Sequence, residues 1–145
     1  MSYCNRRIVL EEYGEPSRAA NLKSESIPLP GNGEILVKTS FAPVNPADIN
    51  ILEGRYGSLP PLPATIGTEG SGQVIATGPD VTDIRKGDQV LYLSRTDCWQ
   101  DYVRCTAKQV IRLPGELPEE AACMLKINPA TAWLLLHQDD GQIPG

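Results

Sequence analysis

The sequence predicts a mainly β protein, a small barrel or sandwich with little helix. Short β-rich segments separated by turn residues recur from residue 7 to residue 113, whereas helix-like patterns occur only after Asn45 and after Pro118. The chain has 145 residues, 41% of them hydrophobic, which suffices for one core but not for a second full domain. One predominantly β domain is therefore expected.

Turn residues divide the β-rich part of the chain into strands. The sequences Gly14-Glu15-Pro16 and Gly87-Asp88 and residues 28–33 have the composition that turns require. Residues 34–41 are the clearest strand, because they are β-prone and partly alternate between apolar and polar side chains. The other strands are expected at residues 7–11, 73–77, 89–93, 99–105 and 109–113, and residues 17–27 are expected to contain one more strand.

A short helix is expected at residues 46–53. Pro46 suits the first helical position, where its missing N–H costs nothing and its φ is already helical. Ile49 and Leu52 give the helix one apolar face, and Gly54 follows where a left-handed C-terminal cap usually stands. The helix therefore begins after Asn45 and ends before Gly54.

Polar residues, prolines and glycines surround this helix more densely than a plain strand or helix requires. Tyr56 follows the helix within the sequence GRYG, and prolines at 60, 61 and 63 stiffen the next loop. Glycines at 67, 70 and 72 bracket Glu69 at a strand entry, where glycine often marks a bulge or a close backbone approach. This stretch is therefore interpreted as half of an active site.

Two helices are expected towards the end of the chain. Pro118 and two glutamates begin the first, with acidic groups near the positive end of the helix dipole. The second begins at Pro129, with Asn128 as a plausible N-cap, and is apolar over most of its surface. A helix that apolar is expected to be covered. His137, near its end, is expected to be a helix-end residue and not a catalyst.

Charge and hydropathy exclude several classes of function. The net charge is −5 and the basic residues are scattered, which gives no footprint for nucleic acid. The N-terminus lacks the apolar region of a signal peptide, and no apolar run of about 18 residues could span a bilayer. Four irregularly spaced cysteines indicate reduced thiols, each expected to be a small buried hydrophobe. Neither nucleic acid nor a membrane is expected as a partner, and a cytoplasmic location is expected.

Six motifs resemble those of the medium-chain dehydrogenase/reductases, in that family's order and approximate spacing. They are GEP at 14–16, APVNPADIN at 42–50, GRYG at 54–57, LPATIGTEGSGQV at 62–74, KGDQV at 86–90 and INPATAW at 127–133. The resemblance implies an irregular GroES-like β-barrel with short helices over residues 1–126. It also implies that residues 127–145 are the connecting helix at the start of a Rossmann cofactor domain that is missing here.

The resemblance points to a zinc-free branch of that family. The zinc-dependent branch has a Cys where Asn45 stands and a His where Thr68 stands, and it adds four closely spaced cysteines. No metal site is therefore expected. Without zinc, Glu69 is expected to form a structural ion pair.

Within the family the motifs are closest to the NADPH-dependent 2-enoyl thioester reductases of fatty acid synthesis. This resemblance implies hydride delivery from NADPH to the C=C bond, with Tyr56 as proton or hydrogen-bond donor. Asn128, Asn45 and Thr131 are the implied cofactor-binding residues. Trp99 and Ile51 are expected in the core, with an acyl pocket as the alternative role.

Two other readings remain open. A zinc-free quinone reductase of the same superfamily could carry Tyr56 too, although INPATAW and Asn50 favour the enoyl reductases. A non-catalytic binding module is the third reading, because no complete G-x-G-x-x-G phosphate loop is present and the isolated chain is expected to be nearly inactive.

The expected substrate is an acyl thioester on coenzyme A or on acyl carrier protein. A full-length enzyme of this type is expected to be a homodimer. Trp133 and Leu134 of the last helix would be left bare in this chain, which predicts self-association.

Overall fold

The computed structural model describes residues 2–94 and 97–137 and confirms a mainly β fold with few, short helices. The chain runs through β1 (Ser2–Leu10), α1 (Pro16–Ala19), β2 (Ala20–Pro28), β3 (Glu34–Phe41), α2 (Pro46–Leu52), β4 (Ala64–Thr65) and β5 (Ser71–Thr77). It continues through β6 (Gln89–Tyr92), β7 (Tyr102–Thr106), the 3₁₀ turn η1 (Ala107–Gln109), β8 (Val110–Arg112), α3 (Glu119–Ala122) and α4 (Asn128–His137).

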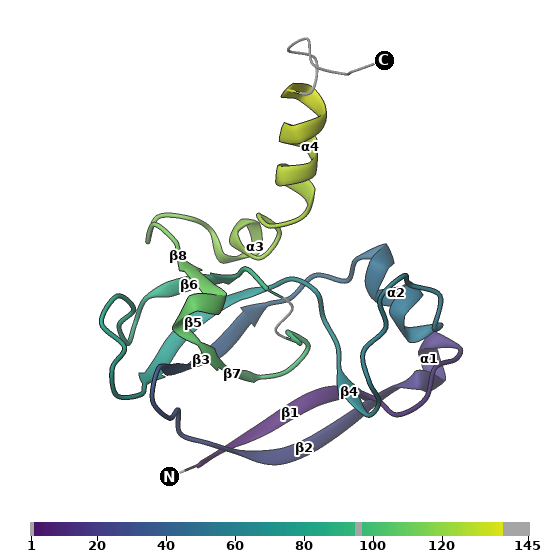
Figure 1. Cartoon of the computed structure of the whole chain (residues 1–145), viewed down its shortest axis with the longest axis horizontal. Helices are drawn as coiled ribbons and strands as arrows, with labels where there is room; N and C mark the ends of the chain where they lie inside the picture. Colours follow the sequence, from purple (N-terminus) through teal and green to yellow (C-terminus); the bar gives the residue numbers. More distant parts are fainter. Residues whose placement is uncertain (1, 95–96, 138–145) are drawn as a thin grey trace.

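The strands form two antiparallel sheets (Figure 1). The smaller sheet has the order β2-β1-β4, and the larger has the order β7-β3-β5-β6-β8. In Figure 1 the β1–β2 hairpin lies below the larger sheet, and α1 and α2 lie together at the right-hand end. Helix α4 projects upwards, on the side away from the hairpin. The expected irregular β body is therefore present, with its helices at the margins.

The segment 99–102 joins the two sheets. It runs along β1, where the Ile8 amide donates to the Trp99 carbonyl (2.9 Å) and the Asp101 amide donates to the Arg6 carbonyl (2.9 Å). The Arg6 guanidinium also donates to both carboxylate oxygens of Asp101, at 2.7 and 3.2 Å. This hydrogen-bonded ion pair lowers the pKa of Asp101. The next residue, Tyr102, then enters β7 of the larger sheet.

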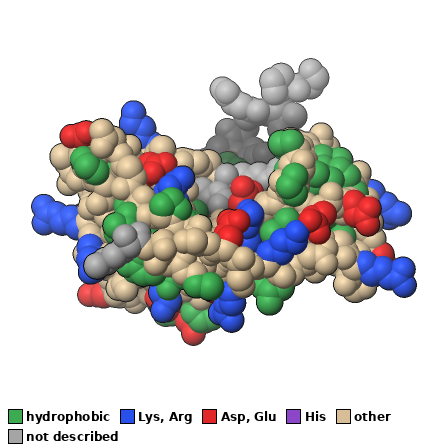
Figure 2. Space-filling view, turned by 90° about the horizontal axis from the view of Figure 1, so that it is seen from below, with side chains coloured by type: hydrophobic (Ala, Val, Ile, Leu, Met, Phe, Trp, Pro, Cys, Tyr) green, Lys and Arg blue, Asp and Glu red, His purple; other side chains and the backbone are tan. Residues whose placement is uncertain are grey.

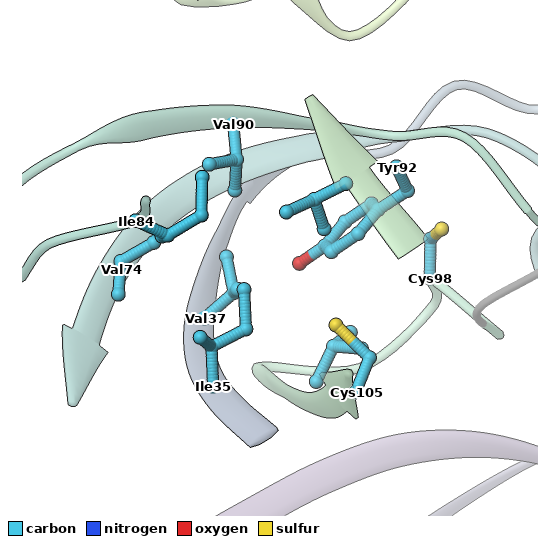
Figure 3. Close-up of a cluster of buried hydrophobic side chains, with 10 residues drawn as sticks. Ile35, Val37, Val74, Ile84, Val90, Tyr92, Cys98 and Cys105 are labelled. Carbon is cyan, nitrogen blue, oxygen red and sulfur yellow. The ribbon is translucent and has the colours of Figure 1, made fainter. Parts of the chain in front are cut away.

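Two clusters of buried side chains form the core. The first lies on one face of the larger sheet and includes the ten residues drawn in Figure 3. Tyr92 is fully buried there, with its hydroxyl 3.4 Å from that of Thr39, and burial raises the pKa of this phenol. The second cluster packs β1 against the helices at the end of the smaller sheet and consists of Leu10, Ala19, Ile51, Leu52 and Ile66.

Most expected strands are present, but several boundaries were wrong. β1 begins five residues earlier than expected, because it pairs with β2 along its whole length from Ser2 to Leu10. The strand expected within residues 17–27 is β2, and the single turn α1 precedes it. The two-residue strand β4 was missed, since it exists only through pairing with Val9 and Leu10. Each error lies where a distant partner decides the conformation.

Charges of both signs alternate over the face shown in Figure 2, with small hydrophobic areas between them. This even mixture matches the scattered charges of the sequence. None of the helices in residues 2–94 and 97–137 has the length and apolar content that crossing a bilayer requires.

Helix α4 forms where an apolar helix was expected, but its side chains are largely exposed. Trp133, Leu134, Leu135 and Leu136 are between 55% and 77% exposed. The Trp133 and His137 rings stack with centroids 4.4 Å apart, so His137 is a helix-end residue as expected. The expected connecting helix of residues 127–145 is thus described only as far as His137, and residues 138–145 lie outside the described part.

Two leucines of the β1–β2 hairpin test the second cluster. Leu10 is fully buried and Leu22 is 67% exposed. Leu10→Ala is expected to lower the free energy of unfolding by about 2–5 kcal/mol, because it removes apolar contacts and leaves a cavity. Leu22→Ala is expected to change it by less than about 0.5 kcal/mol. Urea denaturation of both variants checks this, and equal losses would contradict the assignment of Leu10 to the core.

Candidate functional site

The helix α2 begins at Pro46, as the sequence predicted, and ends at Leu52, one residue before the predicted end. The Asn45 amide donates to Asp48 Oδ2 (2.8 Å), which is the backbone half of a capping box. At the other end Gly54 has φ +73°, and a Cβ there would lie 3.0 Å from the Tyr13 side chain. Glycine is therefore required both by conformation and by space.

Two buried carboxylates connect α2 to the loop that follows β4. Asp48 and Glu69 are fully buried. Asp48 Oδ1 accepts from the Thr68 amide (3.0 Å), and Glu69 Oε2 accepts from Asn45 Nδ2 (3.0 Å). The other oxygen of Glu69, Oε1, accepts from the Ile127 amide (2.8 Å). We call Asn45, Asp48, Thr68, Glu69 and Ile127 the buried polar network.

The ion pair expected for Glu69 is wrong. Within residues 2–94 and 97–137, no cation pairs with its carboxylate, which is instead satisfied by one side-chain amide and one backbone amide. The nearby cation is Lys126, and its ammonium donates to the Thr68 carbonyl (2.7 Å). A buried carboxylate that accepts directed N–H bonds needs no salt bridge to be stable.

The backbone before α2 is fixed from the other side by Trp99. Its indole Nε1 donates to the Pro43 carbonyl (3.1 Å), two residues before Asn45. The Trp99 ring also lies against Gly67, which has φ +109° and where a Cβ would come within 2.6 Å of the ring. Only glycine allows this approach.

Of the two residues weighed for an acyl pocket, Ile51 lies in the core, 1% exposed. Trp99 is half-buried and lines a hollow of about 410 Å³ together with Ile8, Phe41 and Val44.

The connector between α3 and α4 is held to this network at two points. Lys126 contacts the Thr68 carbonyl and Ile127 contacts Glu69, as described above. A third bond, from Ser40 Oγ to Glu119 Oε1 (2.8 Å), ties α3 to the end of β3. The first turn of α4 is thereby placed next to Asn45.

Tyr56 lies in the loop beyond α2 and is 43% exposed. The loop is anchored where the Tyr13 hydroxyl donates to the Pro60 carbonyl (2.5 Å). Its neighbour Arg55 forms an exposed ion pair with Glu53 at 3.5 Å. Because α2 is seven residues long, roughly 10 Å separates the Asn45 end from the Tyr56 end.

Asn128 and Thr131 lie exposed in the first turn of α4, directly after Ile127. Asn128 was expected as the N-cap of this helix, but it is the first helical residue. The Ile127 amide is instead satisfied by Glu69, which comes from a distant loop. The structure therefore brings Asn45 close to the start of α4, while Tyr56 stands at the far end of α2.

Two members of this region had little signal in the sequence. Asp48 could have been found, because an acidic residue three positions after Asn45 fits a capping box. Lys126 had no such signal, since nothing in the sequence places it beside Thr68. The Thr68 hydroxyl is buried and has no hydrogen-bond partner in the described part of the chain.

The cysteines do not form a metal site in the described residues, where no group of three His, Cys, Asp or Glu side chains could hold a metal ion. Cys98, Cys105 and Cys123 are buried as expected, whereas Cys4 is exposed. Burial raises the pKa of Cys105 to about 12. The pKa of Cys123 is also raised, by burial and by the nearby charge of Glu69.

Comparison with known proteins identifies the family of this chain. Residues 31–115 match the family described as the alcohol dehydrogenase GroES-like domain. A mitochondrial enoyl-[acyl-carrier-protein] reductase of Xenopus tropicalis is 36% identical over 145 residues, which cover 99% of this chain. The chain spans only 41% of that protein's length.

Solved structures show the same fold. The complex of Etr1p with NADP and crotonyl-CoA superposes with a TM-score of 0.89 at 27% identity, over 99% of this chain and 46% of that one. A protein described as a putative NADPH:quinone reductase from Bacillus thuringiensis gives 0.80 at 29% identity, over 92% of this chain and 40% of that one. These likenesses confirm the expected GroES-like fold.

Thiol reactivity tests the placement of the cysteines. Cys4 is expected to react rapidly with a disulfide reagent such as DTNB in the native protein, because it alone of the four is exposed. The three buried thiols are expected to react only after denaturation. The absorbance at 412 nm checks this, with Cys4→Ser as the control that removes the fast phase. A fast phase of more than one thiol would contradict the described burial.

Proposed function

This chain belongs to the alcohol dehydrogenase GroES-like domain family, and on that premise we propose that it is the Tyr56-bearing part of an NADPH-dependent 2-enoyl thioester reductase. The observation that carries the proposal is the match to an enoyl-[acyl-carrier-protein] reductase along 99% of the chain. The likeness to the Etr1p complex with NADP and crotonyl-CoA supports the same substrate class and cofactor.

Tyr56 is the proposed hydrogen-bond and proton donor. When a hydride adds to the β carbon of an enoyl thioester, negative charge develops on the thioester oxygen. A phenol is protonated at neutral pH and can donate to that oxygen in the transition state. The 43% exposure of Tyr56 on an anchored loop supports this role, because a donor must be accessible to a substrate.

The start of α4 is the proposed cofactor side. Bound NADPH supplies the hydride. The exposed amide of Asn128 and hydroxyl of Thr131 can both donate and accept hydrogen bonds, which fits the carboxamide of a nicotinamide ring. Asn45 is proposed to contribute to the cofactor side through its buried side-chain amide, which donates to Glu69.

Reduction of a quinone is the second candidate, supported by the likeness to the described NADPH:quinone reductase. The motif INPATAW and Asn50 favour the enoyl thioester, and the first candidate is therefore preferred. The proposed substrate carriers are coenzyme A and acyl carrier protein. The homodimer and the cytoplasmic location stay predictions from the sequence.

Turnover tests the proposal directly. NADPH oxidation is followed at 340 nm with crotonyl-CoA and with a quinone, using the longest polypeptide in which this chain is encoded. Crotonyl-CoA is expected to be reduced faster than the quinone. Tyr56→Phe is expected to lower kcat by about 10²-fold or more with little change in KM, because the lost donor acts mainly in the transition state.

Tyr3→Phe is the matched control for this substitution. Tyr3 lies on β1 and its ring packs on Tyr102 with centroids 5.0 Å apart, remote in the chain from the proposed site. Its replacement is expected to leave kcat unchanged. Full activity of Tyr56→Phe would exclude the proton-donor role, and preferential turnover of the quinone would favour the second candidate.

A further inference from the structure

We propose that Glu69 is a positioning residue that fixes the first turn of α4, and with it Asn128 and Thr131, relative to α2. This inference rests on the proposed function for its effect on catalysis. The structural part of it, that Glu69 holds the start of α4, stands on the hydrogen bonds of this chain alone.

The buried carboxylate of Glu69 depends on hydrogen-bond donors that the protein supplies. Glu69 is fully buried and can only accept hydrogen bonds when it is ionised. Its two oxygens take donors from opposite directions in the sequence, Asn45 Nδ2 on one side and the Ile127 amide on the other. Losing either donor would leave one oxygen of a buried carboxylate without a hydrogen bond, which is costly, so the three residues are held together.

Ile127 lies directly before the first turn of α4. The first N–H groups of an α-helix have no partner within the helix, and a negative charge near them is favourable. The Ile127 carbonyl accepts from the Thr131 amide (2.9 Å), so Ile127 occupies the N-cap position directly before α4. Glu69 therefore acts as a cap contributed by a loop 58 residues earlier in the chain.

Hydrogen bonds also connect Glu69 to α2, the helix that precedes the loop with Tyr56. Asn45 donates to Glu69 through its side chain and to Asp48 through its backbone, and Asp48 lies in α2. The same helix ends just before the loop that carries Tyr56. One chain of hydrogen bonds thus connects the start of α2 with the start of α4. A shift of Glu69 would move the proposed cofactor side relative to the proposed proton donor.

Reversing the polarity of one hydrogen bond tests this assignment. Glu69→Gln can still accept from the Ile127 amide, but its new NH₂ group then faces the Asn45 NH₂ group, donor against donor. In the double variant Asn45→Asp with Glu69→Gln, the Gln donates to the Asp and the net charge equals that of the natural chain. Glu116→Gln, an exposed carboxylate before α3, is the matched control.

Hydrogen exchange of the backbone amides in the 145-residue chain is the first readout. Glu69→Gln is expected to speed exchange at residues 126–131 by roughly tenfold, the effect of losing one net hydrogen bond. The double variant is expected to restore most of the protection, and Glu116→Gln to change nothing. Unchanged exchange in Glu69→Gln and in Glu69→Leu, which removes both acceptor oxygens, would overturn the proposal. So would a double variant that is as unprotected as the single one or fails to fold.

Turnover of the longest encoded polypeptide is the second readout. Glu69→Gln is expected to raise KM for NADPH more than it lowers kcat, and the double variant to recover it, because positioning acts on the cofactor side. Tyr56→Phe is expected to show the opposite split. Absence of NADPH oxidation in the natural sequence would count against the proposed function only, since the exchange data would still report on Glu69. A recovery of protection without recovery of KM would overturn the catalytic part of the inference.

Discussion

The carboxylate of Glu69 is the constraint on which the arrangement of this site depends. It has no access to solvent, so the free energy of its burial must be offset by donors that the protein supplies. Those donors come from Asn45, before α2, and from Ile127, before α4. Two elements that are far apart in the sequence are therefore brought to one point by a single side chain. The Lys126 ammonium on the Thr68 carbonyl adds a second contact to the same junction.

The loops that carry Asn45 and Glu69 are also contacted by the segment that joins the two sheets. The segment 99–102 links the two sheets, because it hydrogen-bonds to β1 and then continues into β7. Trp99, within that segment, reaches the Pro43 carbonyl and lies on Gly67. The two loops that carry Asn45 and Glu69 are thus held from the core side by one indole ring. Trp99 restrains one loop by a hydrogen bond to Pro43 and the other by packing on Gly67. Both loops are therefore restrained by more than their own prolines and glycines.

The two ends of α2 have different surroundings, and this difference separates their proposed roles. At the Asn45 end the backbone and side-chain amides of Asn45 both donate to buried carboxylates, as a positioning element requires. At the far end Tyr56 is partly exposed and Arg55 is paired at the surface with Glu53. A reacting group must meet a substrate, whereas a supporting group must not move. The supporting group Asn45 therefore lies before α2, and the proposed reacting group Tyr56 lies beyond its other end.

The sequence by itself determined the β-rich body, the limits of α2 and the family, because these depend on local residue types and on motifs that keep the family's order and spacing. Pro46 and Gly54 specify where a helix begins and ends wherever the segment lies. Only the tertiary structure decided that Glu69 pairs with amides in place of a cation, and that it caps α4 where Asn128 was expected to do so. The short strand β4 and the contact of Lys126 with Thr68 were likewise invisible in the sequence. Each of these joins residues distant in the chain, and a buried polar group selects whichever partner the fold brings within hydrogen-bonding distance, which no local pattern records.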